Sequence, residues 1–198
     1  GSINLAEFVC ETGFDFAGFK YCVQEAVFAL NEVLDEGLPL HPLKEQRESV
    51  YDWRQIGLGI FGLADLLIKL GIKYGSPEAI DLCDMIGHTM ADMAIKTSAV
   101  LAKEYGAYPK YKPEAVEQSA FYSKNALGET KELVESFGLR NSQLLTIAPT
   151  GSLSTMLGVS GGIEPIFANY YTRKTESLKG HDEYYKVYTP TETEYMDK

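Results

Sequence analysis

Residues 144–158 read LLTIAPTGSLSTMLG, and the character of the chain changes within them. The apolar run from Gln143 to Ile147 has the length of a strand. Pro149 prevents a strand from continuing, because it has no amide hydrogen to donate. The residues from Thr150 onward have the composition of a short helix, so we expect a strand to end and a helix to begin here.

The turn between this strand and this helix carries groups that suit an anion. Gly151 permits backbone conformations that other residues avoid, and Thr150, Ser152 and Ser154 place three hydroxyl groups within five positions. The first amide groups of a helix have no partner inside the helix, and such groups commonly bind phosphate. The turn therefore predicts a phosphate-binding loop. An ordinary capped turn is the alternative that the local pattern leaves open.

The composition of the whole chain narrows the classes of partner. The 198 residues are 45% hydrophobic and carry a formal net charge of −10. The hydrophobic content predicts a packed interior, and one domain over residues 1–198 is the simplest organisation, since no repeat or linker is visible. The negative charge argues against nucleic acid, whose backbone requires a basic surface. It still allows a small anionic ligand.

The three cysteines predict neither a disulfide framework nor a zinc site. Cys10, Cys22 and Cys83 are odd in number and form no C-x-x-C pair, which fits a reducing cytoplasm. No apolar stretch approaches the roughly 20 residues that span a bilayer, and no signal peptide is visible. The histidines are scattered and show no spacing typical of metal ligands. We therefore expect a cytoplasmic protein that binds neither membrane nor metal.

Apolar periodicity and capping residues predict three helices besides those at residues 52–70 and after Thr150. They are residues 15–36 with Asp15 as N-cap, residues 76–106 with Ser76 as N-cap, and residues 129–137 ending at Gly138. The buried face expected for the long central helix consists of Ile80, Cys83, Gly87, Met90, Ala94, Ser98, Leu101 and Tyr105.

The remaining segments divide into expected strands and irregular chain. Residues 2–9 and 166–175 have the pattern of strands. Residues 38–43 contain two prolines and are expected not to be helical. Residues 107–128 are expected to be irregular, and the tail after Glu176 is polar.

Residues 57–62 read GLGIFG, which matches the G-x-G-x-x-G of dinucleotide-binding turns. A true fingerprint follows a buried strand, whereas the preceding YDWRQI is polar. Apolar residues at helical spacing run from Ile56 to Leu70 through all three glycines, so we place them inside a helix that begins near Asp52. Each such glycine costs about 1 kcal/mol relative to alanine, which indicates close packing against a neighbour. We therefore prefer a structural role over NAD binding.

Three stretches of sequence, in the same order as in a known family, give the chain a resemblance to ribonucleotide reductases. A-P-T-G-S-L-S at Ala148 to Ser154 is followed by G-I-E-P at Gly162 to Pro165 and by Tyr171 with Arg173. The stretch from Arg54 to Asp65 and the opening GSINLAEFV are similar to two further motifs of the family. The glycine of A-P-T-G resembles the class II, adenosylcobalamin-dependent enzymes rather than class I.

The resemblance implies a fold, a reaction and a set of site residues. The fold is the C-terminal part of the ten-stranded α/β catalytic barrel, mostly helical here with a few short strands. The reaction converts ribonucleotides to 2′-deoxyribonucleotides by thiyl-radical chemistry. Adenosylcobalamin, a thioredoxin-like reductant, the remainder of the reductase chain and a homodimer are the implied cofactor and partners. The implied substrate-phosphate site consists of Ala148, Pro149, Thr150, Gly151, Ser152, Leu153 and Ser154.

The radical cysteine of this family lies in an N-x-C-x-E motif, which this chain lacks. Cys10, Cys22 and Cys83 match no catalytic position of the family. We therefore expect no catalytic residue here, and expect the chain to be part of a longer enzyme that does not reduce nucleotides alone. It would be a separate domain or one product of a split gene.

Other interpretations of particular residues remain open. Tyr170 and Tyr171 could relay a radical, but packing along a strand is the preferred explanation. Arg173 could pair with Glu164 or with a phosphate, and a surface salt bridge is an equal alternative. A nicotinamide dehydrogenase would require a strand ahead of Gly57, and a non-catalytic helical interaction module would leave the A-P-T-G stretch unexplained.

Overall fold

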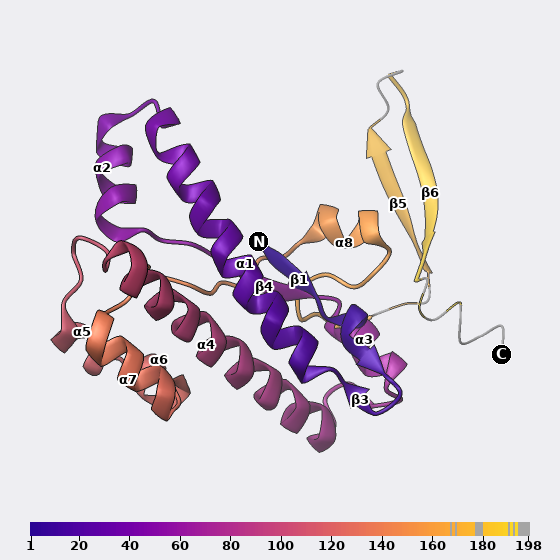
Figure 1. The fold of residues 1–198 in the computed structure, drawn as a ribbon. Helices are drawn as coiled ribbons and strands as arrows, with labels where there is room; N and C mark the ends of the chain where they lie inside the picture. The colour runs from indigo at the N-terminus through magenta and orange to yellow at the C-terminus, as the bar shows by residue number, and fades with distance from the viewer. Residues whose placement is uncertain (167, 169, 177–179, 190, 192, 194–198) are drawn as a thin grey trace.

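The computed structural model describes residues 1–166, 168, 170–176, 180–189, 191 and 193. Two long helices, α1 (Phe16–Gly37) and α4 (Pro77–Tyr105), lie against each other at the centre of the molecule (Figure 1). Both begin where the sequence predicts. The Asp15 carboxylate accepts a hydrogen bond from the Gly18 amide at the start of α1, and the Ser76 hydroxyl accepts one from the Ala79 amide at the start of α4.

The long helix α4 buries a broader face than the sequence predicts. It packs against α1 on one side and against α7 (Gly128–Phe137) on another. Of the expected stripe, Ile80, Gly87 and Tyr105 are exposed. Two neighbouring helices demand contacts over a wider arc than a single stripe provides. The buried residues of α4 are Ala79, Leu82, Ile86, Met90, Ala91, Ala94, Ile95, Thr97, Ser98, Ala99, Leu101 and Ala102.

Several short helices occupy segments that we expected to be irregular. Residues 38–43 begin with the 3₁₀ helix η2 (Leu38–Leu40), followed by α2 (Lys44–Trp53). Within 107–128 the chain forms α5 (Pro113–Glu117) and α6 (Ala120–Asn125). For η2 and α5 we were wrong because we treated Pro39 and Pro113 as breaks, whereas proline is well suited to the first turn of a helix. For α6 we missed the Ser119 hydroxyl, which caps the helix by accepting from the Tyr122 amide.

The strands are short, and they bring distant parts of the chain together. β1 (Ser2–Asn4) pairs in parallel with β4 (Gly59–Phe61), and β2 (Val9–Cys10) pairs with β3 (Gly13–Phe14). The prediction of one strand over residues 2–9 was wrong in its middle. There the Asn4 side chain accepts from the Ala6 amide and starts the 3₁₀ helix η1 (Leu5–Phe8).

The glycine-rich segment is extended rather than helical, so the helix predicted from Asp52 to Leu70 was wrong over residues 54–62, whereas residues 63–69 are helical. Helix α2 ends where Arg54 adopts a left-handed conformation, and α3 (Leu63–Lys69) begins after Gly62, whose φ is +74°. Between them the backbone bonds to another segment: the Leu58 amide donates to the Leu144 carbonyl (2.9 Å), and the Thr146 amide donates to the Leu58 carbonyl (3.0 Å).

The segment predicted as a strand at residues 143–147 forms a single parallel bridge, between Leu58 and Leu145. It runs beside the glycines of GLGIFG. A Cβ atom at Gly59 would overlap the Thr146 carbonyl oxygen and lie 3.3 Å from the Cα of Ile147. Close packing is thus the reason for glycine here, as we inferred, although the element is a strand.

A network of polar side chains connects α1 with the end of α2 and with Asn141, which precedes the extended segment 143–147. The side-chain amides of Asn31 and Asn141 bond to each other reciprocally (2.9 and 3.2 Å), and Asn141 also donates to the Arg54 carbonyl (2.9 Å). The Arg54 guanidinium donates to Asp35 at 2.5 and 2.8 Å. Ser98 on α4 donates to Asn141 at 3.1 Å, so the network spans the core.

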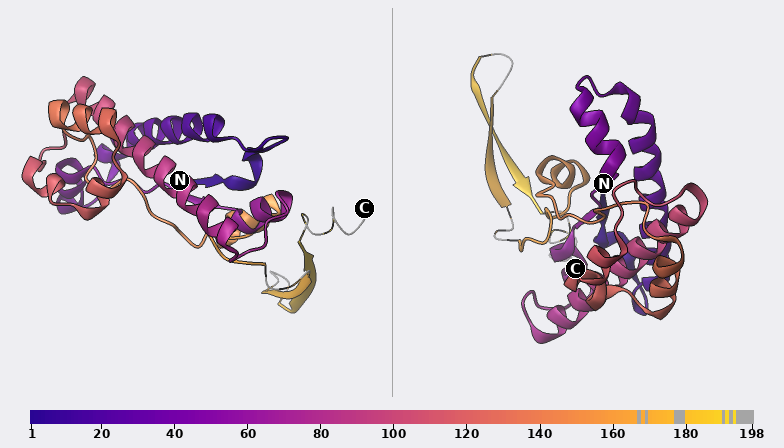
Figure 2. Two further views of the ribbon diagram at one scale, coloured as in Figure 1. Left: turned by 90° about the horizontal axis from the view of Figure 1, so that it is seen from below. Right: turned by 90° about the vertical axis from the view of Figure 1, so that its left-hand side faces the viewer.

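The C-terminal part forms α8 (Gly151–Leu157) and then a hairpin of β5 (Tyr170–Glu176) and β6 (Asp182–Tyr188). The hairpin projects from the helical body (Figure 2). The fold is therefore mostly helical with a few short strands, as predicted, and the strands among the described residues do not close into a barrel.

Candidate functional site

The predicted phosphate loop is a sharp turn between extended chain and helix α8. Thr150 precedes α8 with φ +50° and ψ +26°, a left-handed conformation that is rare for a β-branched residue. Its hydroxyl oxygen accepts a hydrogen bond from the Gly162 amide at 2.9 Å. We expected Gly151 to supply the unusual backbone geometry, and this was wrong: the left-handed residue is Thr150, one position earlier.

At Gly151 the absence of a side chain leaves open space at the start of α8. Among the described residues, no atom lies within 4 Å of the position that its Cβ would occupy. The amide groups of Gly151, Ser152 and Leu153 also donate to no other group in the part of the chain that the structure describes. The start of α8 is thus open, and its backbone is accessible to a ligand.

The three predicted hydroxyl groups do not converge on one point. Thr150 is engaged by Gly162, and the buried Ser154 donates to the Gly151 carbonyl at 3.2 Å. Ser152 is exposed at the start of the helix. Thr155, which we did not predict, donates to the same Gly151 carbonyl at 2.8 Å. Ser152 and Thr155 are the exposed hydroxyl groups of this set, so both can meet a ligand from solvent.

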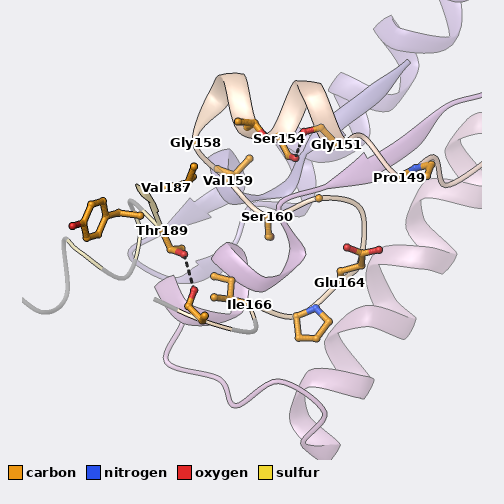
Figure 3. Close-up of a pocket in the computed structure, with 15 residues that line it drawn as sticks. Pro149, Gly151, Ser154, Gly158, Val159, Ser160, Glu164, Ile166, Val187 and Thr189 are labelled. Atoms are coloured by element: carbon orange, nitrogen blue, oxygen red, sulfur yellow. Dashed lines mark hydrogen bonds between the residues drawn. The ribbon is translucent and has the colours of Figure 1, made fainter. Parts of the chain in front are cut away.

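A cavity of about 430 Å³ lies between α8, the loop after it and the end of the hairpin (Figure 3). Of the predicted site residues, Pro149, Gly151 and Ser154 line it, whereas Ala148, Thr150, Ser152 and Leu153 do not. The other lining residues are Thr155, Gly158, Val159, Ser160, Gly161, Glu164, Pro165, Ile166, Ala168, Val187, Tyr188 and Thr189.

The loop 158–163 is fastened to helix α3 by a residue that the sequence analysis missed. Asp65 is fully buried, and its carboxylate accepts hydrogen bonds from the Ser160 amide (2.6 Å) and from the Thr191 hydroxyl (2.5 Å). The Gly62 amide donates to the Ser160 carbonyl at 2.9 Å. The signal was present in the sequence: an acidic residue stands inside the apolar run GLADLL.

These contacts also bear on the dinucleotide interpretation of GLGIFG. Gly62 does stand at a strand-to-helix turn, contrary to our expectation. The Ser160 carbonyl, however, occupies the Gly62 amide at the start of α3, where a pyrophosphate would have to bind. Gly57 and Gly59 face Thr146 rather than open space. The geometry therefore argues against a dinucleotide at these glycines.

Arg173 and Tyr170, which lie in the hairpin strand that follows α8, have partners within the protein. Arg173 donates to the Thr155 hydroxyl at 3.2 Å, so it approaches α8. The Tyr170 ring lies 5.7 Å from that of Tyr188 across the hairpin. The side chain of Tyr171 lies outside the described residues. Cross-strand packing accounts for Tyr170 without a radical role.

Cys22 and Cys83 have the environments of structural residues, whereas Cys10 lies at the surface. Cys22 and Cys83 pack against the core, and burial raises the pKa of each thiol, which disfavours the reactive thiolate. Cys10 is exposed and bonds to Thr12 and Gly13. Among the described residues, no group of histidine, cysteine and acidic side chains is arranged to hold a metal ion, and no helix has the length and apolarity needed to cross a bilayer.

Comparison with known proteins identifies the family. The sequence model described as "Ribonucleotide reductase, barrel domain" matches residues 1–194. The chain is 32% identical, over 89% of its length, to ribonucleoside-diphosphate reductase subunit alpha of Chlamydia muridarum. It is 34% identical, over 87% of its length, to the vitamin B12-dependent ribonucleoside-diphosphate reductase of Mycobacterium tuberculosis. It is 30% identical, over 89% of its length, to the ribonucleoside-diphosphate reductase large subunit of African swine fever virus.

The chain spans 19%, 22% and 26% of the length of these three relatives. The family match covers nearly the whole chain, and it includes both the glycine-rich segment and the turn at α8. By this match the chain belongs to the ribonucleotide reductase barrel-domain family.

Proposed function

We propose that this chain forms part of a ribonucleotide reductase and that the loop Ala148 to Ser154 binds the phosphates of the ribonucleotide substrate. The observation that carries the proposal is the open space at Gly151, together with the free amide groups at the start of α8. A side chain at this position would cover those amides. Glycine leaves them accessible to a phosphate oxygen.

The surroundings of the loop support an anionic ligand of moderate size. The cavity of about 430 Å³ is in the range of small-molecule sites. Arg173 brings a guanidinium group to α8 through Thr155, and such a group binds phosphate well. Glu164 lines the same cavity, and its charge opposes a phosphate at that end. We therefore place the phosphates at Gly151 to Leu153.

The proposed reaction replaces the 2′-hydroxyl of the ribose with hydrogen and releases water. By resemblance to the family, a thiyl radical removes the 3′ hydrogen, and two cysteine thiols supply the electrons and become a disulfide. Cys22 and Cys83 do not fit this role, because they are free cysteines that pack against the core, and neither lines the cavity beside α8. In our proposal this chain holds and orients the substrate, and other parts of the enzyme supply the redox groups.

We further propose that the enzyme is of class II and uses adenosylcobalamin, on the basis of the glycine in A-P-T-G and of the vitamin B12-dependent relatives. The described residues do not themselves fit this cofactor. Four cavities formed by the described residues have volumes of about 350–440 Å³, which suits a ligand much smaller than a corrin. Adenosylcobalamin is therefore a proposal about the whole reductase.

The partners of this chain follow from the same proposal. Leu153, Met156 and Leu157 are exposed on α8, although they are apolar. Such a surface supports contact with the remainder of a reductase chain. A thioredoxin-like reductant, a homodimer and a cytoplasmic location remain predictions from the resemblance and the composition. One domain over residues 1–198 is likewise a proposal, supported by a core that includes α1, α3, α4 and α7.

The proposal is tested by blocking the loop with a bulky side chain. Gly151 is replaced by Trp, and Gly128→Trp serves as a matched control, because Gly128 also begins a helix and also faces open space. Cytidine diphosphate is titrated into the ¹⁵N-labelled chain, and amide shifts are followed. We expect the wild type and Gly128→Trp to respond at residues 151–153, and Gly151→Trp to lose at least about tenfold in affinity. Absence of a response in the wild type, or unchanged binding by Gly151→Trp, would overturn the proposal.

A further inference from the structure

The buried carboxylate of Asp65 is connected to the proposed phosphate loop through the backbone of Ser160. Asp65 lies in the first turn of α3 and has no exposed surface. A buried carboxylate is costly unless its oxygens accept hydrogen bonds. One oxygen accepts from the Ser160 amide (2.6 Å) and the other from the Thr191 hydroxyl (2.5 Å). The carboxylate thus has two separate branches of contact.

The branch through Ser160 fixes the loop that follows α8. Both backbone groups of Ser160 are held, the amide by Asp65 and the carbonyl by the Gly62 amide. Figure 3 shows Ser160 on this loop, below α8 and beside the cavity. A residue held at both its amide and its carbonyl has little freedom to shift. The position of Ser160 therefore fixes where residues 161 and 162 begin.

Two residues beyond Ser160, the chain meets the strained turn. The Gly162 amide donates to the Thr150 hydroxyl oxygen at 2.9 Å. A Cβ at Gly161 would lie 3.0 Å from the Pro149 carbonyl oxygen, so the two backbones approach closely. The left-handed conformation of Thr150 is unfavourable for a β-branched residue and persists only where the surroundings hold it. Gly161 and Gly162 are those surroundings.

We infer that Asp65 is a positioning residue, which holds the Thr150 turn, and hence the start of α8, through Ser160 and Gly162. The geometric part of this inference depends only on the contacts above. Its consequence for ligand affinity rests on the proposed function. A purely structural explanation is that Asp65 only anchors Thr191 and the chain after the hairpin.

The two branches are separated by substitution. Asp65→Ala removes both branches, whereas Thr191→Val removes only the Thr191 branch and leaves the bond to Ser160. Asp65→Asn is the conservative rescue. Its side-chain oxygen can still accept from the Ser160 amide, and its NH₂ group can donate to the Thr191 hydroxyl oxygen. Each variant is studied as the ¹⁵N-labelled 198-residue chain. The measurements are hydrogen exchange of the Gly162 amide without ligand and affinity for cytidine diphosphate.

We expect exchange at Gly162 in Asp65→Ala to rise, and affinity to fall, by roughly tenfold, as for the loss of a hydrogen bond to a charged group. Thr191→Val should stay within about twofold of the wild type in both, and Asp65→Asn within about threefold. Equal exchange at Gly162 in Asp65→Ala and Thr191→Val would overturn the inference.

The experiment also separates failure of this inference from failure of the proposed function. If the wild type does not bind the nucleotide, the proposed function fails, and the exchange comparison still decides the role of Asp65. If Asp65→Ala does not fold, the exchange rates of the Ser160 and Gly162 amides are compared in the wild type. Rates within about threefold of each other support the inference, because the two amides are then released together, and a Gly162 amide that exchanges more than about tenfold faster than the Ser160 amide overturns it.

Discussion

Replacement of Gly59 by alanine tests how tightly the glycine-rich strand is packed. The added methyl group would overlap the Thr146 carbonyl oxygen and lie 3.3 Å from the Cα of Ile147. Both are backbone atoms, so no side chain can move aside. The strand must separate from residues 144–147. The bonds at risk are those from Leu58 to Leu144 and from Thr146 to Leu58.

The expected cost follows from two effects. Forcing a methyl group into a packed interior costs about 1–3 kcal/mol. Weakening two backbone hydrogen bonds adds about 0.5–1.5 kcal/mol for each bond that is lost. Some relaxation is expected, so we predict that Gly59→Ala lowers the free energy of unfolding by about 2–4 kcal/mol.

The measurement is urea denaturation followed by circular dichroism, with Gly87→Ala as the control. Gly87 lies on the exposed side of α4, and no atom of the described residues is within 4 Å of its Cβ position. The same chemical change should there raise stability by about 0.5–1 kcal/mol, because alanine favours a helix over glycine. A cost below about 0.5 kcal/mol at Gly59 would refute the packing argument.

Two further predictions concern the buried polar network. The Arg54 guanidinium, mainly through its hydrogen bonds, holds the pKa of Asp35 below its usual value. The stabilisation of the fold by this lowered pKa is therefore present above the unfolded pKa of about 4, and it is lost as the pH falls through the folded pKa. The stability difference between wild type and Asp35→Asn, measured by urea titration across pH, should be constant above about pH 5 and shrink on acidification. It should be small, below about 1 kcal/mol, since the Asp35 side chain is 48% exposed; an increase at low pH would contradict this. Asn141→Ala should cost about 3 kcal/mol in denaturation experiments, because it leaves the buried Arg54 carbonyl without its donor and removes two hydrogen bonds of the Asn31 side chain, which keeps those to Val27 and Arg54. A loss below about 1 kcal/mol would show that water or rearrangement replaces these bonds.

The sequence predicts best those elements whose ends carry local signals. The starts of α1 and α4 and the end of α7 at Gly138 depend on a capping side chain or a glycine, and these act within a few residues. The prolines near residues 38–43 and 113 misled us, because the same residue breaks one helix and begins another. The position of proline relative to the first turn depends on the chain around it.

The phosphate loop shows the same division at the level of a site. The sequence located the turn and the helix that follows it. The family resemblance implied that this turn binds the substrate phosphates. It did not reveal that Thr150 rather than Gly151 is left-handed, because that conformation depends on Gly162, twelve positions away. Nor did it identify Asp65, whose partners lie 95 and 126 positions away.

The sequence by itself determined the long helices, the family and the location of the candidate site. These depend on periodicity, caps and short motifs, which are properties of neighbouring residues. Only the tertiary structure decided that GLGIFG is a strand, although its apolar spacing favours a helix. The backbone of residues 56–58 bonds to Gln143, Leu144 and Thr146, and the absence of side chains at Gly57 and Gly59 lets that segment approach. Contacts between segments more than 80 positions apart have no local signal in the sequence, because these segments meet only when the whole chain has folded.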